Sequence, residues 1–339
     1  MLLLLGACAP ITLPVDDTER VDSEVVDDTE EPDDTEVIDT GNGLGPLPYP
    51  TVEYDCDNIP DTYEERVLNG ARAYHGMAFD TDGSLIGWDG WNAITKTPYE
   101  GDATSWVPGF YGVEQIVRHP NGDLYTSLLD HAEVYRFTPD GGSERITGGL
   151  LLAYGMTLGP DGMFYVSDGH LHRMDPETGE LERLLSGSGG WSELYRDVAF
   201  SLDSTVMYIV KAGTGSEWIY KVDLDEDLNL IGEPERFANV PGQWKDGVQV
   251  DACGYLWVPE YQKAALFRIS PDGKTVDKIL ATAETGYGHG TEWGTGIGGW
   301  REDAIYLPLP YNSAKVRELV IGVPDGRLVR TWKGEKSWY

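Results

Sequence analysis

The sequence predicts an all-β protein, a six-bladed β-propeller with four-stranded antiparallel blades. The first observation is composition, because 42 Gly, 20 Pro and 11% aromatic residues in 339 favour short strands joined by tight turns. The second is a strand–turn–strand unit that occurs six times, at spacings of about 40, 40, 42, 50 and 49 residues. The third is another turn that follows each unit, which completes a four-stranded repeat of the length of a propeller blade.

The repeated unit is clearest in the segment KDGVQVDACGYLWVPEY, where two strand-like runs flank a turn at residues 251–254. The six units begin at Ala73, Val113, Ala153, Tyr195, Lys245 and Gly294. The later turns read TPYEGD, TPDGGS, DPETGE, DLDEDL, SPDGKT and VPDGRL. Most of them place Pro at a corner that needs its fixed φ and Gly where a positive φ is favoured.

The ring needs a closing strand, and two segments compete for this position. EERVL, Glu64–Leu68, precedes the first unit at the position of a fourth strand, and RLVRTW, Arg327–Trp332, follows the last unit. We favour the N-terminal segment as the closing strand.

The N-terminus MLLLLGACAP predicts a lipoprotein. Leu5 to Cys8 resembles a bacterial lipobox, so residues 1–8 are expected to be a signal peptide and Cys8 to be lipidated, although a positively charged start is missing. Residues 9–50 are expected to be an acidic, disordered linker and residues 51–339 the propeller. The predicted location is the cell envelope, extracytoplasmic, on the outer membrane or cell surface, with the lipid as the only membrane attachment.

Negative charge dominates the chain and argues against nucleic-acid binding. The net charge is −33, and residues 16–40 alone hold thirteen Asp or Glu against one Arg. Proteins that bind nucleic acid need basic surfaces, so no nucleic-acid partner is expected.

Three cysteines divide into one and two. If Cys8 carries lipid, Cys56 and Cys253 remain as a pair in an oxidising compartment, where a disulfide is expected. The alternative is two unrelated buried thiols.

The segments YGMTLGPDGMFYVSD, DGVQVDACGYLWV and LFRISPDGK resemble the regucalcin/gluconolactonase family, the senescence marker protein type, and its NHL-repeat relatives. The resemblance implies a divalent cation such as Ca²⁺ at the central channel, held by a Glu, an Asn and an Asp. Only Asp246 matches, because His75 stands for the Glu and Arg196 for the Asn, with Asp197 adjacent. The candidate metal ligands are therefore Asp246, Asp197 and His75, while Arg196 would repel a cation.

The inner strands are expected to bring a polar group of residues to one end of the channel, namely His75, Glu114, Tyr154, Arg196, Asp197 and Asp246. With Arg196 present, we predict a charge pair between Arg196 and Asp246 that shapes a ligand-binding mouth. The alternative is that Arg196 pairs across the channel and plugs it.

Three functions remain open. We favour a tethered propeller that binds a small polar molecule or an envelope protein at its channel. The alternatives are a metal-dependent lactone or ester hydrolase of the gluconolactonase type and a structural envelope protein. Whether the chain is an enzyme therefore stays open, and its catalytic residues and substrate are not predicted.

Overall fold

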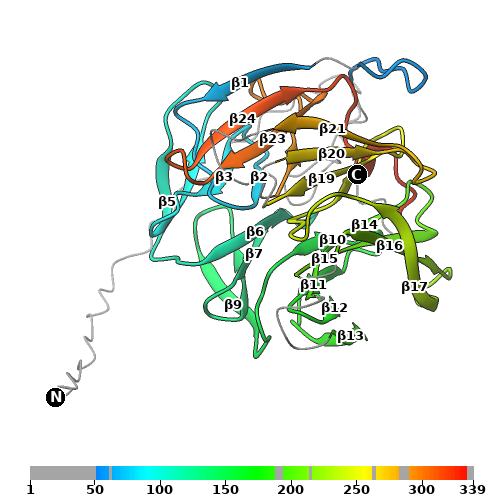
Figure 1. The fold of residues 1–339 in the computed structure, drawn as a ribbon. Coiled ribbons are helices and arrows are strands. Elements are labelled where there is room, and N and C mark those ends of the chain that lie inside the picture. The colour runs from blue at the N-terminus through cyan, green and yellow to red at the C-terminus, as the bar shows by residue number, and fades with distance from the viewer. Residues whose placement is uncertain are drawn as a thin grey trace, which may run out of the picture. The chain divides into compact units, whose positions relative to one another are not determined.

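Six four-stranded sheets are arranged in a ring (Figure 1) in the computed structural model of the protein. The structure describes residues 51–60, 63–187, 194–213, 216–261, 265–281 and 290–333. Neighbouring strands in every sheet are antiparallel, so the predicted six-bladed β-propeller is confirmed.

The first three blades follow the chain from the inner strand outward. Blade 1 contains β2 (Met77–Phe79), β3 (Leu85–Trp88), β4 (Ala93–Thr97) and β5 (Thr104–Pro108). Blade 2 contains β6 (Val113–Arg118), β7 (Leu124–Leu128), β8 (Glu133–Phe137) and β9 (Ser143–Gly148). Blade 3 contains β10 (Met156–Leu158), β11 (Phe164–Ser167), β12 (Leu171–Met174) and β13 (Leu181–Leu185).

Blades 4 and 5 repeat this order, and blade 6 combines both ends of the domain. Blade 4 contains β14 (Leu194–Phe200), β15 (Val206–Ala212), β16 (Trp218–Leu224) and β17 (Leu230–Asn239). Blade 5 contains β18 (Gln249–Val250), β19 (Leu256–Glu260), β20 (Ala265–Ile269) and β21 (Val276–Ala281). Blade 6 contains β22 (Glu292–Trp293), β23 (Ala304–Leu309), β24 (Lys315–Val320) and the N-terminal β1 (Glu64–Leu68).

The N-terminal segment closes the ring, as we favoured. β1 pairs antiparallel with β24, with Glu64 opposite Val320 and Leu68 opposite Val316. The competing segment forms no strand, because Asp325 caps a 3₁₀ helix, η1 (Gly326–Leu328), and accepts a hydrogen bond from the backbone N–H of Arg327.

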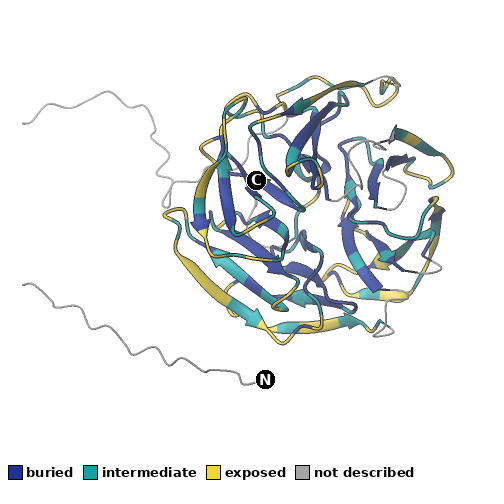
Figure 2. Ribbon diagram, turned by 60° about the vertical axis from the view of Figure 1, so that its left-hand side comes forward, coloured by how far each residue is buried: buried dark blue, intermediate teal, exposed yellow. Residues whose placement is uncertain are grey.

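The hydrophobic core lies between the faces of adjacent blades. One cluster joins Ile86 and Ile94 of blade 1 to Ile116 and Phe137 of blade 2, and comparable clusters fill the other contacts between blades. Figure 2 shows buried residues along the inner strands and exposed residues along the outer ones. Each blade therefore buries its apolar faces against the two neighbouring blades, as expected of a repeat fold.

The chain enters every blade at the same face of the ring, which we call the mouth face. Because neighbouring strands are antiparallel, the connections between blades and those between the second and third strands of a blade lie on this face. The connections between the first and second strands lie on the opposite face, the far face.

A C-terminal segment, residues 323–333, crosses the far face. The N–H of Ala252 donates to the carbonyl of Pro324, and that of Thr331 donates to the carbonyl of Leu202. The N–H of Lys333 donates to Pro160, so the segment spans the ends of three inner strands. It therefore covers the channel at the end opposite to the mouth.

The predicted disulfide between Cys56 and Cys253 is present, with the two Cα atoms 5.4 Å apart. It ties the N-terminal segment to the β18–β19 connection on the far face. Nearby, the N–H of Thr51 donates to the Glu302 carboxylate at 2.9 Å. The chain therefore enters the propeller along the far face.

The N-terminal predictions lie outside the described residues, including Cys8 and the linker that ends at residue 50. In the part of the chain that the structure describes, no helix has the length and apolar character needed to cross a membrane.

Candidate functional site

The mouth of the channel brings together the six side chains that the sequence analysis singled out. They line a single cavity of about 20 Å³, together with Gly76, Gln115, Gly155 and Gly290. The six are His75, Glu114, Tyr154, Arg196, Asp197 and Asp246. A water molecule needs about 10–15 Å³ of such space, so side chains fill most of the mouth.

Two β-bulges explain why consecutive residues both face the channel. In β14, Tyr195 pairs with Lys211 and Asp197 with Val210, which leaves Arg196 as the extra residue. In β6 the register also shifts, between Val113 and Ile116. A regular strand would send neighbouring side chains to opposite faces, whereas a bulge lets both Arg196 and Asp197 line the channel.

Arg196 is the centre of the mouth. Its Nε donates to Oδ1 of Asp246 at 2.5 Å and its Nη2 forms an ion pair with the same carboxylate. Nη2 also lies 3.6 Å from Oε2 of Glu114, and the guanidinium stacks on Tyr154 with 4.0 Å to the ring centre. Burial alone would lower the pKa of Arg196, but the two carboxylates outweigh it and raise that pKa. The predicted pair of Arg196 and Asp246 is therefore present.

His75 completes the charged group from the other side. Its Nδ1 lies 3.1 Å from Oε2 of Glu114, and its ring lies 4.9 Å from that of Tyr74. Burial would raise the pKa of Glu114, yet His75 and Arg196 hold it below its ordinary value. Glu114 is therefore a carboxylate shared between an imidazole and a guanidinium.

Gly155 allows the backbone of Arg196 to come close to blade 3. A Cβ on Gly155 would lie 2.1 Å from the carbonyl oxygen of Arg196, far inside van der Waals contact. The absence of a side chain at Gly155 thus fixes the position of the bulge that presents Arg196.

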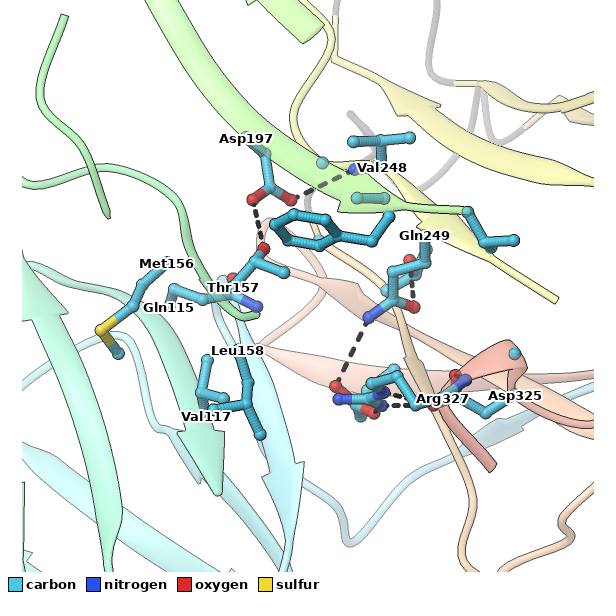
Figure 3. A pocket seen from close by; sticks show the side chains of 18 of the residues that line it. Gln115, Val117, Met156, Thr157, Leu158, Asp197, Val248, Gln249, Asp325 and Arg327 are labelled. Carbon is cyan, nitrogen blue, oxygen red and sulfur yellow. Dashed lines mark hydrogen bonds and ion pairs between the residues drawn. The ribbon is translucent and has the colours of Figure 1, made fainter. Parts of the chain in front are cut away.

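Asp197 lies deeper, below the ion pair. It accepts hydrogen bonds from Oγ1 of Thr157 at 2.7 Å and from the N–H of Val248 at 3.2 Å (Figure 3). Burial nevertheless raises its pKa to about 6, since these bonds do not replace full hydration.

A second chamber of about 40 Å³, lined by both polar and apolar side chains, lies between the mouth and the C-terminal segment. Its polar lining includes Gln115, Thr157, Asp197, Gln249 and Arg327 (Figure 3). Thr291 and Glu292 also line it. Arg327 forms an ion pair with Glu292, yet burial raises the pKa of Glu292 to about 7. The space fits a few water molecules.

Sequence reasoning did not identify the chamber. The available signal was an uncharged polar residue in three of the inner strands, Gln115, Thr157 and Gln249. Arg327 carried no such signal, because the η1 helix brings it to the channel from a distant part of the chain.

The family resemblance implies a divalent cation, but the residues at the mouth do not fit one. Asp246 is bonded to Arg196, His75 to Glu114, and Asp197 to Thr157. A guanidinium cannot donate electrons to a metal and its charge repels one. Accordingly, no group of three or more His, Cys, Asp or Glu among the described residues is placed to hold a metal ion.

Comparison with known sequences supports the predicted resemblance in one part of the chain. Residues 156–285 match the family described as SMP-30/Gluconolactonase/LRE-like region. A curated relative, the 6-deoxy-6-sulfogluconolactonase of Pseudomonas putida, is 28% identical over 130 residues. This match covers 36% of the present chain and 40% of the relative, so the chain spans about two fifths of that protein.

Solved structures share the fold over most of the chain. A gluconolactonase from Xanthomonas campestris has a TM-score of 0.64 at 16% identity, covering 82% of this chain and 99% of its own. The calcium-binding protein regucalcin from Agrobacterium tumefaciens has a TM-score of 0.60 at 16% identity, covering 78% and 96%. Residues 156–285 thus match the SMP-30/Gluconolactonase/LRE-like region, and the described part of the chain has the six-bladed propeller fold of these solved structures.

Proposed function

We propose that the protein opens small lactones by hydrolysis at the mouth, with the guanidinium of Arg196 in place of the family's metal ion. The sequence match to the gluconolactonase-like region supports the reaction class. One observation carries the assignment of residues. His75 lies 3.1 Å from Glu114, and Glu114 lies 3.6 Å from Arg196, so a base, the carboxylate that orients it and a cation share one concavity.

The residues have distinct roles in this reaction. The oxygen of a water molecule adds to the lactone carbonyl carbon while the imidazole of His75 takes the proton, and Glu114 stabilises the resulting imidazolium. Arg196 contacts Asp246 and Glu114 through Nε and Nη2. We assign to Nη1 the hydrogen bond to the carbonyl oxygen of the lactone, where negative charge develops. The ring C–O bond then breaks, the imidazolium returns the proton to the departing oxygen, and a hydroxy acid leaves.

The test measures the rate of hydrolysis of a panel of lactones that includes glucono-δ-lactone. The acid released is titrated in a pH-stat, and the spontaneous rate is subtracted. We expect turnover that EDTA does not change. His75→Asn should lower kcat/KM by a factor of about 10²–10⁴, and Arg196→Gln by a factor of about 10²–10³. Ile231→Ala, on the exposed outer strand β17, is the control and should match the wild type.

Two results would overturn the proposal. Loss of turnover with EDTA and its recovery with Ca²⁺ would show that a metal ion, and not Arg196, stabilises the carbonyl oxygen. Absence of turnover for every lactone would exclude the reaction itself.

A second candidate is binding without chemistry, of a small polar molecule or an envelope protein. The observation in its favour is that Arg196 already contacts both carboxylates in a mouth of only about 20 Å³. Thermal-shift titration with gluconate separates the two functions. A rise in Tm without lactone turnover supports binding alone, and turnover excludes it.

The location of the protein is a separate proposal, a lipid anchor at Cys8 that holds the propeller at the cell envelope. Support comes from the Leu5–Cys8 motif and from a disulfide that suits an oxidising compartment. Cys8→Ser should move the protein from the membrane fraction to the soluble fraction. Membrane attachment that survives this substitution would contradict the anchor.

A further inference from the structure

Exposed apolar side chains gather on the mouth face. Six large apolar side chains are exposed in the part of the chain that the structure describes, and four of them belong to connections on this face. These four are Trp91, Tyr111, Leu151 and Tyr311, exposed by 73%, 50%, 54% and 56%. Large apolar residues exposed on the face that opens to a cavity are typical of a surface that contacts a ligand.

Three tyrosines connect this rim to the catalytic group proposed above. The hydroxyls of Tyr261 and Tyr311 lie 3.0 Å apart, the rings of Tyr311 and Tyr74 lie 6.1 Å apart, and the ring of Tyr74 lies 4.9 Å from that of His75. They come from blades 5, 6 and 1, so the group exists only in the closed ring. We call Tyr74, Tyr261 and Tyr311 the tyrosine platform.

The backbone holds the platform in place. The N–H of Ala73 donates to the carbonyl of Ala314 at 2.7 Å, which ties the Tyr311 hairpin to the Tyr74 segment. Ser313 and Ala314 have φ values of 56° and 52°, a left-handed conformation that side-chain-bearing residues adopt rarely. A Cβ on Gly90 would lie 2.4 Å from the ring of Tyr74, so the neighbouring hairpin also fits against the platform. Several independent contacts thus hold the tyrosines in one arrangement, as expected of a preformed binding surface.

The chemistry of the platform selects the class of ligand. Tyrosine offers a rigid ring face together with a hydroxyl, and so suits a ligand with C–H faces and hydroxyl edges. The net charge of −33 disfavours polyanions, and the guanidinium of Arg196 at the mouth is already paired with Asp246 and Glu114. A neutral hexopyranose ring has these properties.

We infer that the tyrosine platform is a subsite for a neutral hexopyranose ring, separate from the site of the reacting group. The subsite itself does not depend on the proposed lactone hydrolysis. Only its consequence rests on that function, namely that the substrate is a lactone with a further sugar ring attached. The reacting group lies at His75 and the second ring lies on Tyr311, with Tyr74 between them.

The test is binding of methyl β-D-glucopyranoside to the full chain, measured by isothermal titration and by saturation-transfer NMR. This probe contains a hexose ring but no lactone. We expect binding with millimolar Kd, weakened at least fivefold by Tyr311→Ala. Tyr311→Phe, which keeps the ring, should retain most of the affinity. Ile231→Ala is the matched control, because Ile231 is also 56% exposed but lies on β17 away from the platform.

The outcomes separate this inference from the proposed function. No binding of the glucoside, or equal binding by Tyr311→Ala, overturns the subsite even if simple lactones are hydrolysed. Binding that depends on Tyr311 supports the subsite even if no lactone is hydrolysed. His75→Asn should bind the glucoside like the wild type, and loss of binding in this variant would show that the probe occupies the reacting site instead.

Discussion

The ion pair between Arg196 and Asp246 can be tested by a double-mutant cycle of Arg196→Gln and Asp246→Asn. Both side chains are largely shielded from solvent, with exposed fractions of 12% and 7%, so water screens their interaction little. The substitutions keep the approximate size of each side chain and remove its charge. The cycle therefore reports the interaction between the two charges with little contribution from packing.

The expected magnitude follows from burial and from Glu114. Removing one partner of a buried pair typically costs about 3–5 kcal/mol, because the remaining charge stays buried. Glu114, 3.6 Å from Arg196, partly compensates in Asp246→Asn, so we expect about 3 kcal/mol for each single substitution. The double variant has neither of the two charges, so no unpaired partner remains. Its free energy of unfolding should fall by only about 4 kcal/mol, which gives a coupling energy of about 2 kcal/mol.

The assay is urea denaturation of the wild type, both single variants and the double variant, in the presence of EDTA. The exposed pair of Lys221 and Glu235 is the control, since its 3.1 Å contact has side chains exposed by 33% and 68%. Its coupling energy should not exceed about 0.5 kcal/mol. Additivity of Arg196→Gln and Asp246→Asn within about 0.5 kcal/mol would refute the buried pair.

Three further predictions concern the disulfide, Asp197 and Gly155. Cys253→Ser opens a loop of 197 residues and should lower the free energy of unfolding by about 5 kcal/mol; a urea midpoint unaffected by both this change and reductant would contradict it. Burial raises the pKa of Asp197 to about 6, so stability should fall by about 3 kcal/mol as pH rises from 4 to 6. Asp197→Asn should flatten that part of the stability curve, and an unchanged slope would contradict the assignment. Gly155→Ala, whose Cβ would lie 2.1 Å from the Arg196 carbonyl oxygen, should cost about 1–3 kcal/mol and lower lactone turnover, whereas wild-type stability would show that the bulge can move.

The fold was predictable because its information is local and repeated. Each repeat shows two recognisable turn motifs among its four short strands, and six copies of the pattern fix the number of blades. The closing strand was also predictable, since Glu64–Leu68 stands one strand before the first repeat. The competing segment at Arg327 was a strand candidate because it follows the last repeated unit, but its cap at Asp325 and its ion pair with Glu292 favour a 3₁₀ helix.

The mouth was predictable as a set of residues but not as a geometry. Aligning the repeats placed His75, Arg196 and Asp246 at equivalent strand starts, which is enough to bring them together around a ring. The pair of Arg196 and Asp246 was also predictable, because a charge at the channel needs a partner, but the bulge that lets both Arg196 and Asp197 line the channel was not. The tyrosine platform was not predictable either, because its members come from three blades and meet only when the ring closes.

The choice between guanidinium and metal can be reversed by one substitution. Arg196→Asn places at this position the amide that the family resemblance implies, and it leaves Glu114, Asp246 and His75 facing a mouth that has lost its cation. Two carboxylates without a counter-charge then favour a divalent cation for the same electrostatic reason that they now favour Arg196. With a Kd of about 0.1 mM, 10 mM Ca²⁺ should stabilise Arg196→Asn by about 3 kcal/mol and leave the wild type unchanged, as measured by urea denaturation. Equal effects of Ca²⁺ on both proteins would show that Arg196 does not exclude the metal, and no effect on either would show that the carboxylates cannot converge on a cation.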